Sequence, residues 1–71
     1  MRRRFEFVGG NSAKFWEVSR AGASVTVRFG RLGTQGQSQT KELADAADAQ
    51  KLTDKLIAEK TGKGYVECVI H

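Results

Sequence analysis

The alternation of apolar and polar residues along the chain predicts several short β-strands followed by one helix. Four segments alternate with the two-residue period of a strand, and they cover residues 3–8, 14–20, 24–29 and 65–70. In the third segment, Val25, Val27 and Phe29 share one face. Thr26 and Arg28 share the other face, so we expect one buried side and one wet, basic side on this strand.

Glycine-containing segments separate these strands. Residues 9–11 and 21–23 are typical of tight turns, and residues 30–36 are expected to form a hairpin turn. We expect Gly30, Gly33 and Gly36 to supply the backbone angles that this turn requires. The polar run at residues 35–41 then predicts a solvated fourth strand.

From residue 45 the apolar period changes to that of a helix. Its stripe consists of Ala46, Ala49, Leu52, Thr53, Leu56 and Ile57. Asp45 is predicted to cap the helix at its N-terminus, with Asp48 favourable in the first turn. Lys60 and Lys63 flank Gly62, which marks the expected end.

An antiparallel sheet of four to five strands with one amphipathic helix on one face is the simplest fold that covers all these stripes. The predicted class is therefore α+β, with a single domain over residues 1–71. A chain of this length supports one thin core. Trp16 is expected to anchor it, and its predicted neighbours are Val25, Val27, Leu52 and Leu56.

The composition excludes several classes of protein. No apolar run approaches the roughly 18 residues of a membrane span. The single cysteine, Cys68, alternates with Val66 and Ile70, which predicts a buried, inert thiol. With His71 as the single histidine, the chain offers neither an intrachain disulfide nor a tetrahedral metal site, and we expect no cofactor. No nucleophile–base pair is evident, so an enzyme is not expected.

Charge is distributed unevenly along a chain whose net charge is +4. Residues 1–41 carry eight Lys or Arg against two Glu, whereas residues 42–71 carry four Lys against six carboxylates. A polyanion is therefore expected to meet the first half. The arginines at residues 2–4 are followed by Glu6 and by no apolar segment, so no signal peptide is indicated and a cytoplasmic location is expected.

Three blocks of this sequence resemble the WGR domain family. They are residues 15–18 (FWEV), residues 25–36 (VTVRFGRLGTQG) and residues 59–65 (EKTGKGY). The Trp-Gly-Arg triplet that names the family reads Phe29-Gly30-Arg31 here. WGR domains occur in DNA-damage-sensing poly(ADP-ribose) polymerases and in bacterial proteins, including a molybdate-metabolism regulator and stand-alone short chains. This chain resembles the stand-alone bacterial form.

The resemblance implies binding of nucleic acid, in the first place DNA, and docking to a neighbouring domain. In the polymerases the aromatic residue of the triplet lies against the end of a DNA strand, a role that passes to Phe29. The guanidinium of Arg31 would fork onto a phosphate or onto a carboxylate of a partner.

The residues alone also favour a phosphate-binding surface beside the glycine-rich turn, because charged side chains and backbone N–H groups meet there. Arg28 and Arg31 offer the charge, and the backbone near Gly33 and Thr34 offers the N–H groups. Together with what the resemblance implies, the candidate contacts are Arg20, Arg28, Phe29, Gly30, Arg31, Gly33, Thr34 and Lys41. The glycine spacing lacks the ending of a nucleotide-binding loop.

Two questions stay open at this point. Phe29 is either a core residue, as its alternation suggests, or an exposed stacking platform. The module either binds DNA through phosphates with little sequence specificity, or docks Arg31 and its neighbours onto an acidic protein partner. We expect a monomer with no membrane partner.

Overall fold

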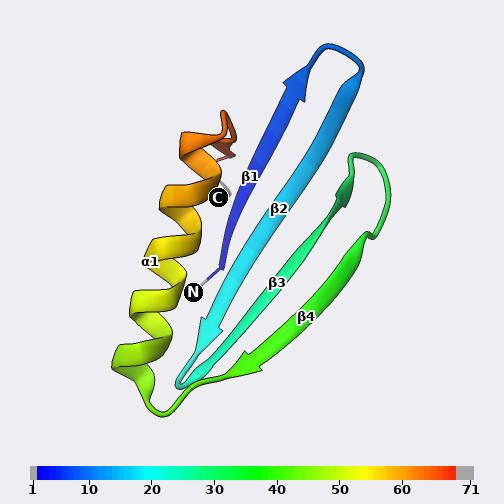
Figure 1. Ribbon diagram of the computed structural model, residues 1–71. Helices are drawn as coiled ribbons and strands as arrows, with labels where there is room; N and C mark the ends of the chain where they lie inside the picture. The colour runs from blue at the N-terminus through cyan, green and yellow to red at the C-terminus, as the bar shows by residue number, and fades with distance from the viewer. Residues whose placement is uncertain (1, 69–71) are drawn as a thin grey trace.

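The computed structural model describes residues 2–68, which form a five-stranded antiparallel sheet with one helix on one face (Figure 1). The elements in chain order are β1 (Arg2–Gly9), β2 (Ser12–Ala21), β3 (Ser24–Arg31), β4 (Gln37–Glu42), α1 (Ala46–Gly62) and β5 (Val66–Cys68). The strands are arranged in the order β4-β3-β2-β1-β5. The predicted α+β class and its single covering helix are confirmed.

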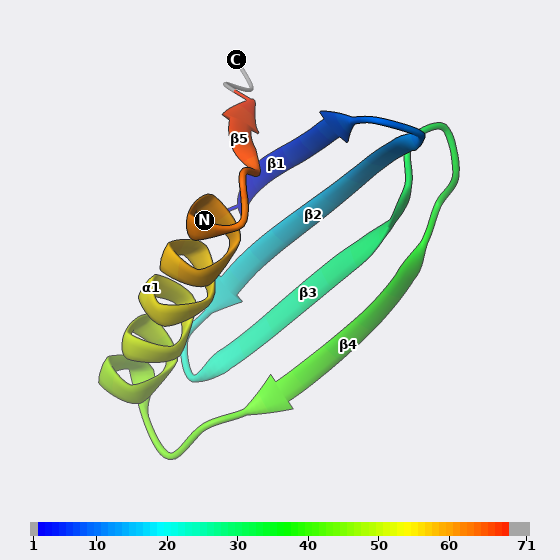
Figure 2. The same cartoon turned by 45° about the horizontal axis from the view of Figure 1, so that its top comes forward.

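The first four strands form a meander, and the last strand returns to its opposite edge after α1 (Figure 2). The turns predicted at residues 9–11 and 21–23 join β1 to β2 and β2 to β3. All six residues of β4 are exposed, as its polar composition predicts. Strand β3 runs to Arg31, two residues further than predicted, so Gly30 and Arg31 belong to the strand and not to the turn.

The helix begins where the sequence predicts. The Asp45 carboxylate accepts a hydrogen bond from the backbone N–H of Asp48 at 2.8 Å and caps the first turn. Ala49 and Thr53 are buried, and the Thr53 hydroxyl donates to the Ala49 carbonyl at 2.8 Å. Ala46 is exposed, contrary to prediction, so the buried stripe begins one turn later. The helix ends at Gly62 with Lys60 in its last turn.

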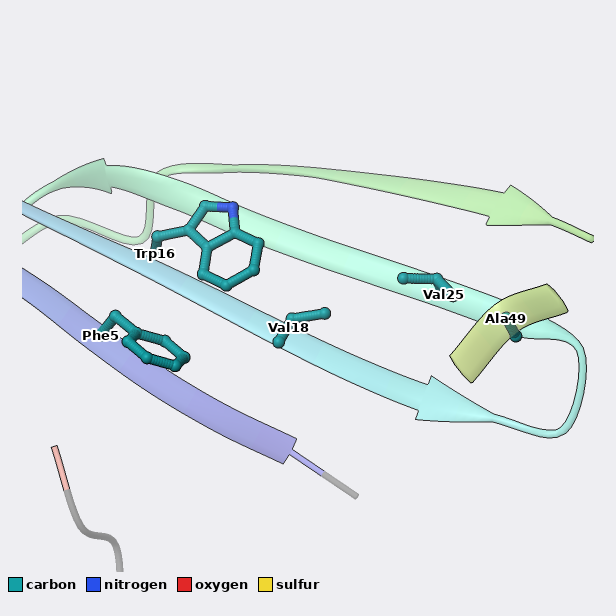
Figure 3. Packing of buried hydrophobic residues seen from close by; sticks show 5 residues of the cluster. All are labelled: Phe5, Trp16, Val18, Val25 and Ala49. Carbon is teal, nitrogen blue, oxygen red and sulfur yellow. The ribbon is translucent and has the colours of Figure 1, made fainter. Parts of the chain in front are cut away.

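The core lies between α1 and the sheet (Figure 3). Its buried residues are Phe5, Trp16, Val18, Val25 and Ala49. Trp16 is 3% exposed, which confirms it as a core residue, and its ring centroid lies 5.6 Å from that of Phe5. The predicted neighbours at positions 27, 52 and 56 pack against this cluster but are only partly buried. The core is therefore buried around Trp16 and Val18, and its apolar residues are partly exposed around Val27, Leu52 and Leu56.

The last strand does not bury the face that was predicted for it. Val66 is 68% exposed and Cys68 is half-buried, because both lie opposite Glu6 and Arg4 on the side of the sheet away from α1. Burial raises the pKa of the Cys68 thiol, and the nearby Glu6 carboxylate raises it further. Residues 70 and 71, which entered the predictions, lie outside the described residues. Within residues 2–68, no helix is both long and apolar enough to cross a membrane.

Candidate nucleic-acid interface

The face of the sheet opposite the helix carries its own buried cluster. Phe15 is 1% exposed and Glu17 is 5% exposed, although alternation along β2 and the pairing of Glu17 with Arg28 place both on the face of Arg28, which was predicted to be wet. Arg4 and Arg28 explain this burial, because their guanidinium carbons lie 4.7 and 5.5 Å from the centroid of the Phe15 ring. Long arginine side chains thus replace a second helix as the cover of this face.

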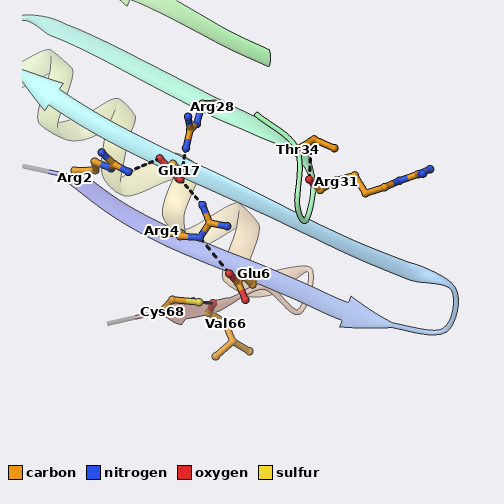
Figure 4. A network of polar contacts seen from close by, with 9 residues as sticks. All are labelled: Arg2, Arg4, Glu6, Glu17, Arg28, Arg31, Thr34, Val66 and Cys68. Carbon is orange, nitrogen blue, oxygen red and sulfur yellow. Dashed lines mark hydrogen bonds and ion pairs between the residues drawn. The ribbon is translucent and has the colours of Figure 1, made fainter. Parts of the chain in front are cut away.

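Glu17 forms ion pairs with three arginines (Figure 4). Arg28 Nη2 donates to Glu17 Oε2 at 2.9 Å, Arg4 Nη1 donates to the same oxygen, and Arg2 Nη2 lies 3.3 Å from Oε1. Burial opposes ionisation of this carboxyl group, but the hydrogen bonds from Arg28 and Arg4 outweigh it, so the pKa of Glu17 is lowered. The arginines on this face are therefore already occupied by a carboxylate.

Arg28 and Arg31 do not form one surface. They are three residues apart on β3, and side chains at odd spacing on a strand point to opposite faces. Arg28 belongs to the Glu17 cluster, whereas Arg31 is exposed beside the turn and extends away from that cluster (Figure 4). Of these two arginines, Arg31 is the one available to a ligand, and it lies on the helix side of the sheet.

Gly30 and Gly36 allow the chain to fold tightly beside Arg31. Phe15 lies opposite Gly30 in the β2–β3 ladder. A Cβ added to Gly30 would lie 2.7 Å from the Gly36 Cα, so Gly30 is required for space; its φ is not positive. Gly36 has a φ of +69°, and a Cβ there would lie 2.3 Å from the Phe29 carbonyl oxygen. The expectation that all three glycines serve turn angles is thus correct for Gly33 and Gly36 only.

Thr34 closes this turn. Its hydroxyl donates to the Arg31 carbonyl at 2.7 Å, and its backbone N–H donates to the same oxygen at 3.1 Å. Phe29 faces the helix side of the sheet, where it is half-buried against the core. Phe29 therefore packs against the core and keeps an accessible surface, and its role as a stacking platform stays a prediction.

A groove of about 1020 Å³ runs between α1 and the helix side of β3 and β4. Its apolar lining comes from both layers and includes Trp16, Val25, Val27, Phe29, Leu52, Leu56 and Tyr65. Its charged lining consists of Lys14, Arg31, Lys41, Lys60 and Glu59. Four cations therefore face one carboxylate around an apolar floor.

Three of these cations gather at one end of the groove. Lys14 is the ladder partner of Arg31, and Lys60 enters from α1, with its Nζ atom 5.7 Å from the Trp16 ring centroid and 5.5 Å from that of Tyr65. Burial lowers the pKa of Lys60, and the positive charges of Lys63 and Lys14 lower it further, against a smaller opposing effect of Glu59. We call Lys14, Arg31 and Lys60 the basic end.

Unlike the arginines of the opposite face, the side chains of the basic end form no ion pair with a carboxylate of the described residues, although Glu59 lies in the same groove lining. Among residues 2–68, none of its three side chains takes part in an ion pair. The ion pairs of this part of the chain engage Arg2, Arg3, Arg4 and Arg28. The basic end thus combines three cations without an ion pair on the lining of one groove, where an anion can meet them together.

The structure brings some of the predicted contact residues together and separates others. Phe29, Gly30, Arg31, Gly33 and Thr34 do lie together at the basic end. Arg20 and Lys41 lie elsewhere, because both pair with Val25 across the sheet. Arg20 is six residues from Lys14 along β2, which places this row about 20 Å from the basic end.

Lys14 and Lys60 were not among the predicted contacts. Both leave a signal in the sequence: Lys14 has the same parity as Trp16 in β2, and Lys60 continues the four-residue spacing of Leu52 and Leu56. These patterns place both lysines on the helix side of the sheet, where the groove opens.

Glu17→Gln is expected to destabilise the fold by about 1–3 kcal/mol at pH 7, because it removes the charge that three arginines share. A carboxyl group with a lowered pKa stabilises the folded state above its ordinary pKa of about 4.3, and this contribution is lost as pH falls through the folded value. The difference from wild type in urea unfolding should therefore shrink between pH 5 and pH 3. Glu67→Gln, at an exposed pair with Arg3, should change stability much less.

The fold and these motifs define a known class of domain. The chain matches the WGR domain model over residues 1–69 and belongs to that family. It is 48% identical to Protein YehF of Escherichia coli (strain K12) over 65 residues, which are 92% of this chain and 24% of that protein. It is 40% identical to Uncharacterized protein YfeS of the same strain over 67 residues, 94% of this chain and 28% of that protein.

A crystal structure of a protein from Bacteroides fragilis has the same fold, with a TM-score of 0.95 and 49% sequence identity. The match covers 97% of this chain and 20% of that one. The chain thus spans about a quarter of the length of the curated relatives it matches. The predicted family is confirmed.

Proposed function

We propose that this chain is a nucleic-acid-binding module that holds DNA through phosphate contacts at the basic end. The observation that carries the proposal is the contrast between the two faces of the sheet. Arginines on the face away from α1 share the Glu17 carboxylate, whereas the basic end has no ion pair among the described residues. Phosphates of a polyanion are the ligands that such an unbalanced cluster attracts.

Aromatic surface beside these cations supports the proposal. Phe29 precedes Gly30 and Arg31 on β3 and keeps part of its surface open to the groove. Aromatic rings next to a basic groove offer a surface on which bases stack without regard to their identity. The sequence resemblance implies the same contact, because Phe29 occupies the aromatic position of the family triplet.

Little sequence specificity is expected of this site. Lysine and arginine side chains that contact phosphates position a duplex but carry no sequence information. Of the glutamines that could read base edges, Gln39 lines the groove on β4. The site is therefore better suited to the backbone or an end of DNA than to a defined sequence.

Arg31→Ala tests the proposal through salt dependence. Binding to short duplexes should weaken for all sequences alike. The slope of log affinity against log salt should decrease in magnitude by about one unit, because one fewer phosphate is neutralised. Arg31→Lys should keep the slope and lose affinity if the guanidinium forms two hydrogen bonds to a phosphate. Fluorescence anisotropy across a salt series measures both quantities.

Lys55→Ala is the matched control, because Lys55 is an exposed cation on α1 that does not line the groove. It removes the same charge from another surface and should leave the slope close to wild type. Equal effects of the two alanine variants would show that net charge alone attracts the DNA, and the basic end would then not be its site.

A further inference from the structure

One helix is too narrow to cover this sheet. Neighbouring strands lie about 4.8 Å apart and a helix is about 10 Å wide, so a helix covers roughly two strands. Helix α1 packs on β2 and β3, and β4 lies beyond it at the edge of the sheet. The helix side of β3 and β4 therefore faces the open groove rather than a second layer.

The exposed lining of this groove is the kind of surface that a second helix buries. Val27 and Phe29 on the sheet and Leu52 and Leu56 on α1 are each only partly buried. They belong to both walls of one groove. An apolar stripe placed between the two layers would remove more of their apolar surface from water. Such burial contributes about 25 cal/mol per Å² to binding.

The charged residues of the groove indicate the charge of the helix that would fill it. Lys41 lies at one end of the groove on β4 and the basic end lies at the other, with Glu59 as the acidic residue of the lining. An occupant with an apolar stripe and acidic flanks would match both the floor and the ends. The stretch of β3 from Val25 to Arg31 is about 20 Å long, the length of a helix of about 14 residues.

We propose that this groove is a docking site for an acidic amphipathic helix, which lies beside α1 over β3 and β4. Leucine-type side chains of the helix contact Val27, Phe29 and Leu52, and its carboxylates pair with Lys41 and the basic end. The site goes beyond the proposed binding of DNA and shares the basic end and Phe29 with it. The helix and DNA therefore compete for one protein surface.

Two synthetic peptides of equal composition and charge test this inference. The first is a helix of about 14 residues with leucines at positions i, i+3, i+4 and i+7 and glutamates on the other face. The second has the same residues in an order that forms no apolar stripe. Amide shifts of the full chain are followed by NMR during each titration, and peptide helicity is followed by circular dichroism.

The patterned peptide should gain helicity and shift the amides of Val27, Phe29, Leu52 and Leu56. The scrambled peptide should bind at least tenfold more weakly. Val27→Thr keeps the shape of the side chain and should reduce affinity for the patterned peptide about fivefold, because it loses a methyl group and buries a hydroxyl. Ser38→Ala, on the opposite face of β4, should leave this affinity unchanged.

Equal binding of the two peptides, with shifts confined to the cations, would overturn the inference and leave a surface for anionic polymers. Absence of binding by the patterned peptide would overturn it as well. Shifts of the groove floor by single-stranded DNA, without any by the patterned peptide, would assign the groove to nucleic acid. None of these results decides whether DNA binds at the basic end, which the Arg31 salt series measures separately.

Discussion

Gly36→Ala is expected to destabilise the fold by about 2–5 kcal/mol. A residue with a side chain loses about 1–2 kcal/mol in the left-handed region, where Gly36 has a φ of +69°. The new Cβ would also lie 2.3 Å from the Phe29 carbonyl oxygen and 2.8 Å from Phe15 Cζ, and such overpacking costs about 1–3 kcal/mol more. Urea unfolding followed by circular dichroism measures the loss.

Gly33→Ala separates these two causes. Gly33 also has a positive φ, of +88°, but a Cβ there meets no atom within 4 Å. This variant should therefore show the backbone cost alone, about 1–2 kcal/mol. Equal losses for the two variants would mean that the close approach of Gly36 to Phe29 does not hold the turn in place.

Trp16→Ala should cost about 3–5 kcal/mol, because it removes the largest side chain of the core. This loss approaches the whole stability expected for a domain of 71 residues, roughly 4–10 kcal/mol. Thermal unfolding should show little cooperative transition near room temperature. Trp16→Phe keeps a ring in the core and should retain a clear transition at a lower Tm.

Lys60 provides a second measurement on the Trp16 variants that remain folded. Its Nζ atom lies 5.7 Å from the Trp16 ring centroid, and burial lowers its pKa. Trp16→Phe leaves a smaller ring, so the pKa of Lys60 should rise towards its ordinary value, as measured by NMR of the lysine side chain. A loss of stability below about 1 kcal/mol in Trp16→Ala, with no change in this pKa, would contradict the role of Trp16 as the anchor.

The helix side of the fold was predictable because its apolar residues repeat with simple periods. Alternation in β3 predicted that Val25 and Val27 face the core, and the helical period predicted the same of Leu52 and Leu56. Alternation assigns residues to two faces but does not tell whether one face or both are buried. Phe15 and Glu17 were missed for this reason, since their burial depends on arginines that reach them from other strands.

The arrangement of the candidate site was predictable where it is local in sequence. Phe29, Gly30 and Arg31 were found from the turn and the triplet, and they do lie together. The basic end also needs the pairing of β2 with β3, which places Lys14 beside Arg31, and the placement of α1, which adds Lys60 to the same groove. Such contacts join residues far apart in the chain, and no short motif encodes them.

A titration of the labelled chain with short DNA duplexes and single strands, followed by amide chemical shifts, tests the central proposal most directly. The proposal predicts saturable shifts at Lys14, Phe29, Arg31 and Lys60 that weaken as salt is added. The amide of Ser38, on the face away from α1, should stay unchanged. Shifts concentrated around Arg28 and Glu17, or no saturable shifts with any of these DNAs, would contradict it.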